Sequence, residues 1–214
     1  MTKRKNSKKF YNITKPVLDI FFGFLILILT LPLFLVIALF IKFSSRGPIL
    51  FYQKRIGKNS KPFKCIKFRT MHPEAEDILR NLLNNNNLLR KEFQETHKIK
   101  NDPRITRIGR FLRKTSLDEL PQLINVIKGE MSFVGPRPVV KDEIIKYGLN
   151  FKKVISVNPG ITGLWQVSGR NKLSYEKRIA LDLNYIKNYS FIMDLRILIR
   201  TFGVIFFPLD RGAY

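Results

Sequence analysis

The residues of this chain best suited to chemistry are two adjacent acids, Asp118 and Glu119, in the segment KTSLDELPQLINVIKGE. A carboxylate is ionised at neutral pH, so it can attack phosphorus without prior deprotonation. The segment also has a structural interpretation. Ser116 and Glu119 have the S-x-x-E spacing of a capping box, acids complement the dipole in a first helical turn, and Gly129 is a typical helix end. Spacing alone favours this structural interpretation.

Residues that could bind a phosphorylated ligand lie on both sides of the acid pair. Arg113 comes shortly before it, and Arg137 lies in GPRP, where two prolines restrict the backbone. A guanidinium binds phosphate oxygens in a bidentate manner, although Arg137 could instead pair with a carboxylate. Gln166 and Arg170, in the glycine-rich segment PGITGLWQVSGR, are candidates for nucleotide or sugar contacts. We expect Trp165 in the same segment to be a core residue.

Several local patterns predict the elements that position these residues. The runs 48–55 and 62–69 are rich in aromatic and branched residues and flank GKNSK, which predicts a β-hairpin. Residues 74–96 are typical of a helix interrupted at the asparagines 84–87. In the segment 102–114 an arginine recurs every three residues, at 104, 107, 110 and 113, with apolar residues between. This spacing predicts a helical turn with a cationic face, for which a solvated surface is an equally good explanation.

Residues 20–41 contain no charged side chain. A helix of this length would reach about 33 Å, enough for a hydrocarbon core of about 30 Å. Pro32 interrupts the run, and Lys and Arg are equally frequent on both flanks, which places both ends on the cytoplasmic side. We therefore predict a re-entrant helix, with a kinked single-pass anchor as the alternative.

Composition limits the class of protein. The chain has 39 Lys and Arg against 16 Asp and Glu, a net charge of +23, which favours an anionic partner or surface. The single cysteine, Cys65, excludes an internal disulfide framework, and with only two histidines it provides too few ligands for a typical zinc site. The apolar segment 190–209 is interrupted by charges, which favours an interfacial helix over a second span, with a buried core helix as the alternative.

From about Lys15 to its end, the chain resembles the bacterial sugar transferases, which are monotopic phosphoglycosyl transferases. The similar segments are FYQKRIGKNSKPFKCIKFRTM, NDPRITRIGRFLRKTSLDELPQLINVIKGEMSFVGPRPVV and PGITGLWQVSGR. The resemblance implies an α+β, mainly helical fold with interfacial amphipathic helices. Residues 1–47 would form the basic N-terminus and the re-entrant membrane helix. Residues 48–214 would form the catalytic domain on the cytoplasmic face of the bacterial inner membrane.

The resemblance also implies a reaction, in which a sugar 1-phosphate passes from a UDP-sugar to undecaprenyl phosphate and UMP is released. This would be the first membrane step of capsule, exopolysaccharide or O-antigen synthesis. Asp118 matches the family's nucleophile, which forms a covalent phosphosugar intermediate, and Glu119 could act as an acid or base or orient a metal. Mg²⁺ held by Asp118 would offset the repulsion between the carboxylate and the diphosphate.

The resemblance further implies membrane lipids and downstream glycosyltransferases as partners, and no nucleic acid. The ending RGAY and the insert between Met71 and Asp102 resemble members that transfer hexose 1-phosphate, of galactose or glucose. Two other classes stay open from the residues alone. A membrane-tethered protein that binds nucleic acid or anionic lipid would use the same charge, and a metal-dependent phosphohydrolase would use the same acids.

Overall fold

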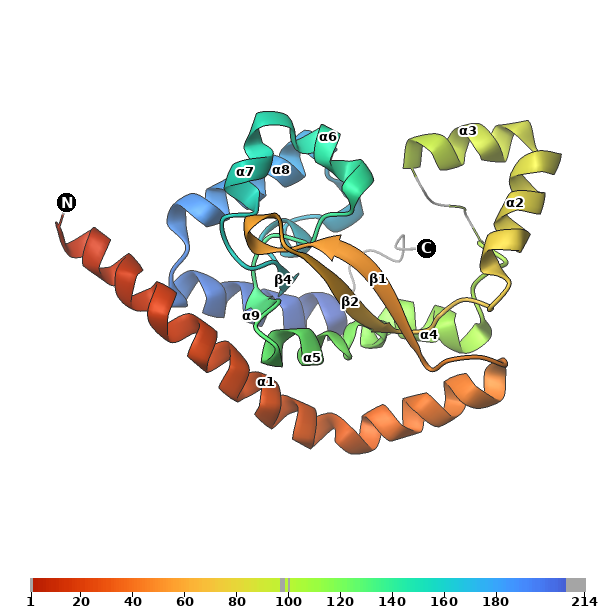
Figure 1. Ribbon diagram of the computed structural model, residues 1–214, viewed down its shortest axis with the longest axis horizontal. Coiled ribbons are helices and arrows are strands. Elements are labelled where there is room, and N and C mark those ends of the chain that lie inside the picture. The colour runs from red at the N-terminus through yellow and green to blue at the C-terminus, as the bar shows by residue number, and fades with distance from the viewer. Residues whose placement is uncertain (1, 97–98, 100, 207–214) are drawn as a thin grey trace. The chain divides into compact units, whose positions relative to one another are not determined.

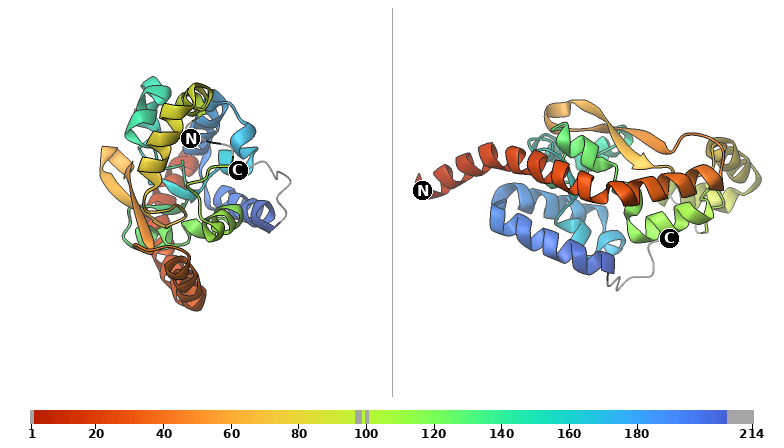
Figure 2. Two further views of the ribbon diagram at one scale, coloured as in Figure 1. Left: turned by 90° about the vertical axis from the view of Figure 1, so that its right-hand side faces the viewer. Right: turned by 90° about the horizontal axis from the view of Figure 1, so that it is seen from below.

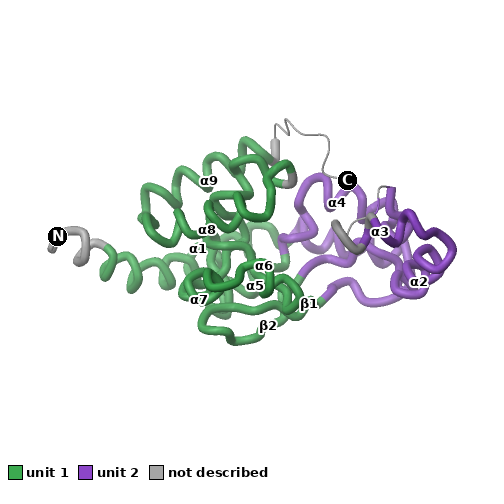
Figure 3. The backbone as a smooth tube through the Cα atoms, turned by 90° about the horizontal axis from the view of Figure 1, so that it is seen from above, with its two compact units in different colours: residues 1–31, 52–66, 121–209 green, residues 32–51, 67–120, 210–214 purple. Residues whose placement is uncertain are grey.

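The computed structural model describes residues 2–96, 99 and 101–206 of the chain. These residues form a mainly helical fold with two small sheets (Figure 1). The chain is divided into two compact units, each built from separate stretches of sequence (Figure 3). Unit 1 comprises residues 1–31, 52–66 and 121–209, and unit 2 comprises residues 32–51, 67–120 and 210–214.

Helix α1, Thr2–Ser44, contains the predicted apolar run and continues through Pro32 (Figures 1 and 2). Among the described helices it alone is long and apolar enough to cross a membrane. Most of its large apolar side chains are exposed, among them Phe21, Phe24, Ile28, Leu29, Leu35, Leu39, Phe40 and Phe43. The division between the two units falls between Leu31 and Pro32, where the sequence predicts a break. Two predictions about this helix stay predictions: that it enters and leaves the membrane on the same side, and that the membrane segment ends at residue 47.

The predicted hairpin is confirmed. Strand β1, Leu50–Ile56, pairs with strand β2, Pro62–Phe68, across the short 3-10 turn η1, Lys58–Ser60. The turn closes with a hydrogen bond from the Gly57 amide to the Lys61 carbonyl at 2.8 Å. Asn59 and Ser60 have positive φ angles of 54° and 62°, as tight turns require.

Unit 2 contains three further helices: α2, Ala75–Asn85; α3, Asn87–Thr96; and α4, Arg107–Thr115. The predicted interruption at the asparagines is confirmed, because Asn86 is extended and its Oδ1 accepts the Leu88 and Leu89 amides. The core of unit 2 joins the second half of α1 to β2 and α4 through Ile37, Ile41, Phe68 and Leu112.

Unit 1 contains five further helices: α5, Gln122–Ile127; α6, Ile144–Tyr147; α7, Phe151–Val154; α8, Tyr175–Asn188; and α9, Phe191–Phe206. It also contains a parallel pair of three-residue strands, β3, Ser132–Val134, and β4, Gly160–Thr162, which was not predicted. Strands this short have no recognisable alternation of side chains. Gly129, at φ 72°, lies just after α5, which confirms the predicted helix end.

A buried polar cluster attaches the first half of α1 to α8 and α9. Tyr11 and Lys15 each donate to Asp194 Oδ2 at 2.6 Å, and the Tyr185 hydroxyl donates to Asp194 Oδ1 at 2.8 Å. These contacts explain why the segment after residue 190 tolerates an acid: Asp194 is buried and hydrogen-bonded rather than exposed.

The remainder of α9 is amphipathic. Ile197 is buried, whereas the exposed apolar side chains include Ile192, Leu195, Ile199 and Phe202, and Arg196 and Arg200 are also exposed. The sequence allowed either an interfacial helix or a buried core helix. The structure has features of both, since one face of α9 packs in the core and the other face is uncovered. Placement of the uncovered face at a membrane surface stays a prediction.

Candidate functional site

The acid pair lies in a short 3-10 helix, η2, Leu117–Glu119, between α4 and Pro121. The predicted capping box is wrong. Ser116 has a left-handed φ of 59°, serves as the C-cap of α4, and makes no side-chain cap bond. An N-cap residue requires an extended backbone, and the next α-helix begins only at Gln122. Capping therefore does not explain why Glu119 is an acid.

Glu119 is instead bound by a lysine from strand β2. The Lys67 ammonium donates to Glu119 Oε1 at 2.6 Å and lies 4.0 Å from Asp118 Oδ2. The three side chains are largely buried, with 17 %, 21 % and 13 % of Lys67, Glu119 and Asp118 exposed. They form a compact charged triad within unit 2, so both acids take part in one electrostatic environment.

Sequence reasoning missed Lys67. It is one of 39 cations in the chain and lies in an ordinary β-type run. The only available signal was its position between two residues that face the core, Ile66 and Phe68, in a segment that resembles the sugar transferases. That signal does not indicate the acids as its partners.

The charge state of Asp118 follows from this environment. The pKa of Asp118 is raised to about 6, chiefly by burial and also by the neighbouring Glu119, although Lys67 and Arg113 act in the opposite direction. At neutral pH this carboxylate is therefore mostly ionised yet more basic than an ordinary aspartate. A more basic oxygen is a stronger nucleophile, so the site is suited to covalent chemistry at phosphorus.

Arg113 is oriented by a neighbouring hydroxyl. Its Nε donates to Thr70 Oγ1 at 2.9 Å, and Thr70 is the second residue after strand β2. Arg113 occupies the last turn of α4, which begins where the Thr106 side chain accepts the Gly109 amide at 2.9 Å. The structure thus brings Arg113, Asp118 and Glu119 together in unit 2.

The predicted cationic face of segment 102–114 is only partly correct. Arg107 and Arg110 are exposed on α4, but Arg104 precedes the helix and is buried. The Arg104 guanidinium donates to both carboxylate oxygens of Asp102 at 2.6–3.0 Å. Arg104 is therefore part of a buried ion pair that stabilises the entry to α4.

The other predicted contacts lie in unit 1. Arg137 is half-buried in the loop after β3, Gln166 lies in the 3-10 helix η5, Trp165–Val167, and Arg170 begins the 3-10 helix η6, Arg170–Lys172. Gln166 donates to the Ile161 carbonyl at 3.1 Å, and Arg170 has a positive φ of 49°. Trp165 is 7 % exposed, which confirms the core assignment. Phosphate or nucleotide contacts by Arg137, Gln166 and Arg170 stay predictions.

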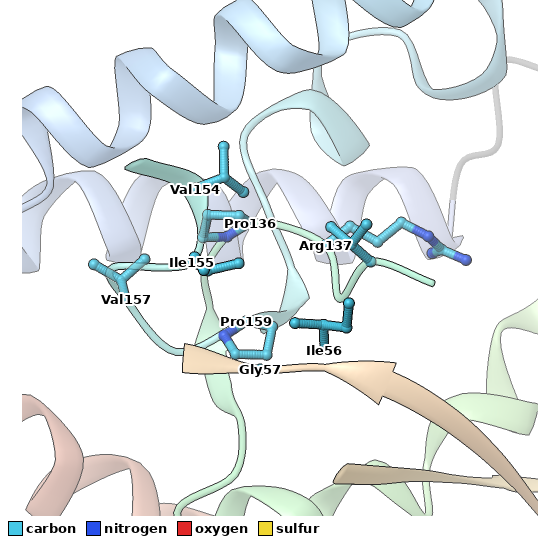
Figure 4. A pocket seen from close by; sticks show the side chains of 9 residues that line it. Ile56, Gly57, Pro136, Arg137, Val154, Ile155, Val157 and Pro159 are labelled. Atoms are coloured by element: carbon cyan, nitrogen blue, oxygen red, sulfur yellow. The ribbon is translucent and has the colours of Figure 1, made fainter. Parts of the chain in front are cut away.

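A small apolar pocket lies beside Arg137 in unit 1 (Figure 4). Its lining includes Val154, Ile155 and Val157, and the Arg137 side chain extends away from these residues. Arg137 is the one charged residue among the described residues of the lining, which is otherwise apolar, and its guanidinium points away from the valine and isoleucine side chains.

The residues fit a Mg²⁺ ion only in one coordination mode. Within the described residues there is no group of three or more acidic, histidine or cysteine side chains that could hold a metal. Mg²⁺ is, however, commonly bound by one or two carboxylates, with water and substrate phosphates as the other ligands. Asp118, which pairs with Lys67 at 4.0 Å whereas Glu119 accepts the lysine's hydrogen bond, is the carboxylate suited to that mode.

Comparison with known proteins identifies the family of this chain. The sequence model of the family described as "Bacterial sugar transferase" matches residues 10–208. The chain is 45 % identical over 202 residues to the exopolysaccharide production protein ExoY of Sinorhizobium fredii, covering 94 % of this chain and 88 % of that one.

Two longer relatives have more specific names. The chain is 45 % identical over 212 residues to the undecaprenyl-phosphate galactose phosphotransferase of Salmonella typhimurium, covering 98 % of this chain and 43 % of the relative. It is 46 % identical over 211 residues to the UDP-galactose-lipid carrier transferase of Erwinia amylovora, again covering 98 % and 43 %. Both the family match and these identities extend over nearly the whole chain, so the protein belongs to the bacterial sugar transferase family.

Proposed function

We propose that this protein transfers a sugar 1-phosphate from a UDP-sugar to undecaprenyl phosphate and releases UMP. The observation that carries the proposal is the buried Asp118 carboxylate, with a raised pKa and no capping role, beside Lys67, Arg113 and Glu119 in a member of this family. The names of the relatives support the lipid carrier, the UDP-sugar and a role in exopolysaccharide production.

The reaction has two displacements at the same phosphorus. In the first, a carboxylate oxygen of Asp118 attacks the β-phosphorus of the UDP-sugar, and the bond from that phosphorus to the bridging oxygen breaks. UMP leaves with the bridging oxygen, and the sugar phosphate remains on Asp118 as an acyl phosphate. In the second, an oxygen of undecaprenyl phosphate attacks this phosphorus, and the Asp118 carboxylate is released.

The surrounding side chains supply charge and orientation. Lys67 neutralises part of the negative charge of the acid pair, so that Asp118 remains available as an anion. We assign phosphate contacts to Arg113, which Thr70 orients, and phosphate or nucleotide contacts to Arg137, Gln166 and Arg170. A bound Mg²⁺ would supply additional stabilisation of the diphosphate charge.

The proposed location is the bacterial inner membrane, with the catalytic residues on the cytoplasmic face. One substrate is a soluble nucleotide sugar and the other is embedded in the bilayer, so the nucleophile must lie at the boundary. The exposed apolar side chains of α1 and the mixed apolar and basic face of α9 support such an attachment.

We propose a hexose, galactose or glucose, as the sugar, because two relatives are named for galactose transfer. The RGAY ending that favoured this prediction lies outside the described residues, whereas the insert after Met71 forms α2 and α3.

One assay tests the function. The purified protein in nanodiscs receives Mg²⁺, a panel of UDP-sugars and undecaprenyl phosphate, and UMP is measured. We expect UMP that depends on the lipid acceptor, and a sugar phosphate on Asp118 by mass spectrometry when the acceptor is omitted. If UMP is released at the same rate with and without the lipid, and free sugar phosphate is the product, the protein is a phosphohydrolase. Salt-sensitive binding of nucleic acid or lipid without any UMP would show a binding protein.

A further inference from the structure

Arg69, the first residue after strand β2, binds the main chain at the end of helix α1. Its Nη1 donates to the Arg46 carbonyl at 2.9 Å, and its Nη2 donates to the Ser45 carbonyl at 2.8 Å and to Ser45 Oγ at 3.0 Å. Because Arg69 is only 7 % exposed, these bonds are shielded from competing water. The planar guanidinium therefore holds two successive carbonyls, directly after the last turn of α1, in a fixed arrangement.

The turn that follows α1 is shaped around this guanidinium. Gly47 has a φ of 119°, which residues with a side chain rarely adopt. A Cβ atom at Gly47 would also collide with Nη1 of Arg69. Beyond the turn, the Arg69 amide donates to the Ile49 carbonyl at 2.9 Å. Arg69 thus holds the chain on both sides of Gly47, with its side chain before the glycine and its backbone after it.

The residues on either side of Arg69 hold the acid site. Two positions before it, Lys67 donates to Glu119 at 2.6 Å, and one position after it, Thr70 accepts from Arg113 at 2.9 Å. All of these residues belong to unit 2, as does the second half of α1. One short stretch of backbone is therefore attached both to the end of α1 and to the side chains around the acid pair.

Apolar packing joins the same parts but does not fix their register. Leu117 and Leu120, which flank the acid pair, pack against the core cluster that contains Ile37 and Ile41 of α1. Apolar burial is not directional, so such a contact allows a helix to slide along its axis. A slip of a single residue would move the helix by about 1.5 Å. Hydrogen bonds require a specific distance and angle, so the contacts of Arg69 prevent this slip.

We propose that Arg69 is a positioning residue, which fixes the depth of Asp118 relative to the membrane by locking the end of α1 to the segment that holds the acid site. The inference rests on the proposed function and on attachment of α1 to the bilayer. A UDP-sugar is soluble and can reach Asp118 at any depth, whereas the bilayer sets the depth of the phosphate of undecaprenyl phosphate. A displacement of about 1 Å can lower a rate by about a hundredfold. Arg69 is therefore needed for the second displacement and not for the first.

The two displacements can be measured separately on the full chain in nanodiscs. Without the lipid acceptor, the rate of a single burst of UMP reports the first displacement, and kcat/KM for undecaprenyl phosphate reports the second. Arg69→Met should leave the burst rate unchanged and lower kcat/KM for the lipid by about tenfold to a hundredfold. With a water-soluble, short-chain polyprenyl phosphate in detergent the loss should be smaller, because the bilayer does not set the depth of that acceptor.

Three further variants separate the lock from the rest of the fold. Gly47→Ala should reproduce the loss, because the added Cβ displaces the guanidinium while Arg69 itself is retained. Ser45→Ala removes only the bond to the hydroxyl and leaves both carbonyl bonds, so it should retain most of the lipid-dependent transfer. Arg80→Met removes an exposed arginine of unit 2 and serves as the matched control, with wild-type rates in both steps.

A distance measurement tests the lock without any substrate. Spin labels on cysteines introduced at Phe43, at the end of α1, and at Lys114, on α4, report the distance between these two helices within unit 2. Both side chains are exposed, whereas Cys65 is 1 % exposed and shielded from the label. The distance distribution should be narrow in the otherwise wild-type protein and broader when Arg69→Met or Gly47→Ala is added.

Any of five results would overturn the proposal: equal losses in both displacements, wild-type kcat/KM for the lipid in Arg69→Met and Gly47→Ala, an equal loss with the short-chain acceptor, an unchanged label distance in these two variants, or failure of both variants to fold. Absence of lipid-dependent UMP release from the wild type is a separate result, which rejects the proposed function. In that case the label distances still show whether Arg69 fixes the end of α1.

Discussion

Replacing Lys67 by methionine is the sharpest test of the acid pair. The ammonium lies 4.0 Å from Asp118 Oδ2 and lowers the pKa of that carboxylate. Two unit charges at this separation interact by about 4 kcal/mol at an effective dielectric constant of about 20. Partial exposure of both side chains reduces this value, so we expect the pKa of Asp118 to rise by about 1 to 2 units in the variant.

The sign of the effect on activity follows from the reactive form. The ionised carboxylate is the nucleophile, so kcat/KM falls as the pH decreases through the pKa of Asp118, which is about 6 in the wild type. In Lys67→Met this acid limb should move to higher pH by about 1 to 2 units. At pH 7 the ionised fraction would fall from about nine-tenths to between about one-half and one-tenth, and activity would partly recover at higher pH.

The assay is the pH profile of kcat/KM for UMP release in nanodiscs at saturating lipid acceptor. Lys64→Met is the matched control, since Lys64 is an exposed lysine on the same strand. An acid limb that stays in place, or moves to lower pH, would refute the electrostatic role assigned to Lys67. A loss of activity equal at every pH would indicate a different role, such as direct contact with the substrate.

The remaining predictions concern the same site and the membrane helix. Asp118→Asn should abolish turnover. It should also raise the free energy of unfolding at pH 8 by up to about 3 kcal/mol, because folding raises the pKa of Asp118 from 3.8 to about 6 and the wild type loses stability as the pH rises between these two values; chemical denaturation checks this. Glu119→Gln should move the acid limb to lower pH, since Glu119 raises the pKa of Asp118. Arg113→Lys should lower kcat/KM by about tenfold at unchanged melting temperature, through loss of the fork and of its bond to Thr70. A tag at the N-terminus should resist labelling from outside intact cells, and labelling there would contradict re-entry.

Local patterns were sufficient where a single stretch of chain decides the structure. The hairpin follows from two β-type runs around a short polar turn, and the break between α2 and α3 follows from consecutive asparagines. The end of α5 follows from Gly129, whose positive φ most residues avoid. Each of these features depends on backbone preferences of neighbouring residues, which the sequence states directly.

Local patterns failed where the same residues allow two conformations. Ser116 has the spacing of an N-cap but closes α4 with a left-handed φ, and the helical periodicity of the arginines does not extend to Arg104, which pairs with Asp102. Both outcomes depend on where α4 starts and stops. The hydrogen bond from the Gly109 amide to Thr106 sets the start, and packing of Leu112 in the core favours this register.

The sequence by itself determined the apolar helix, the excess of positive charge, the acid pair and, through resemblance, the family. Only the tertiary structure decided what surrounds the acids. Lys67 reaches Glu119 across 52 positions in the chain, and Arg113 donates to Thr70 across 43 positions. Such pairs arise from folding of distant segments, and the pKa of a buried carboxylate depends on them, because charge interactions and desolvation are set by distance in space.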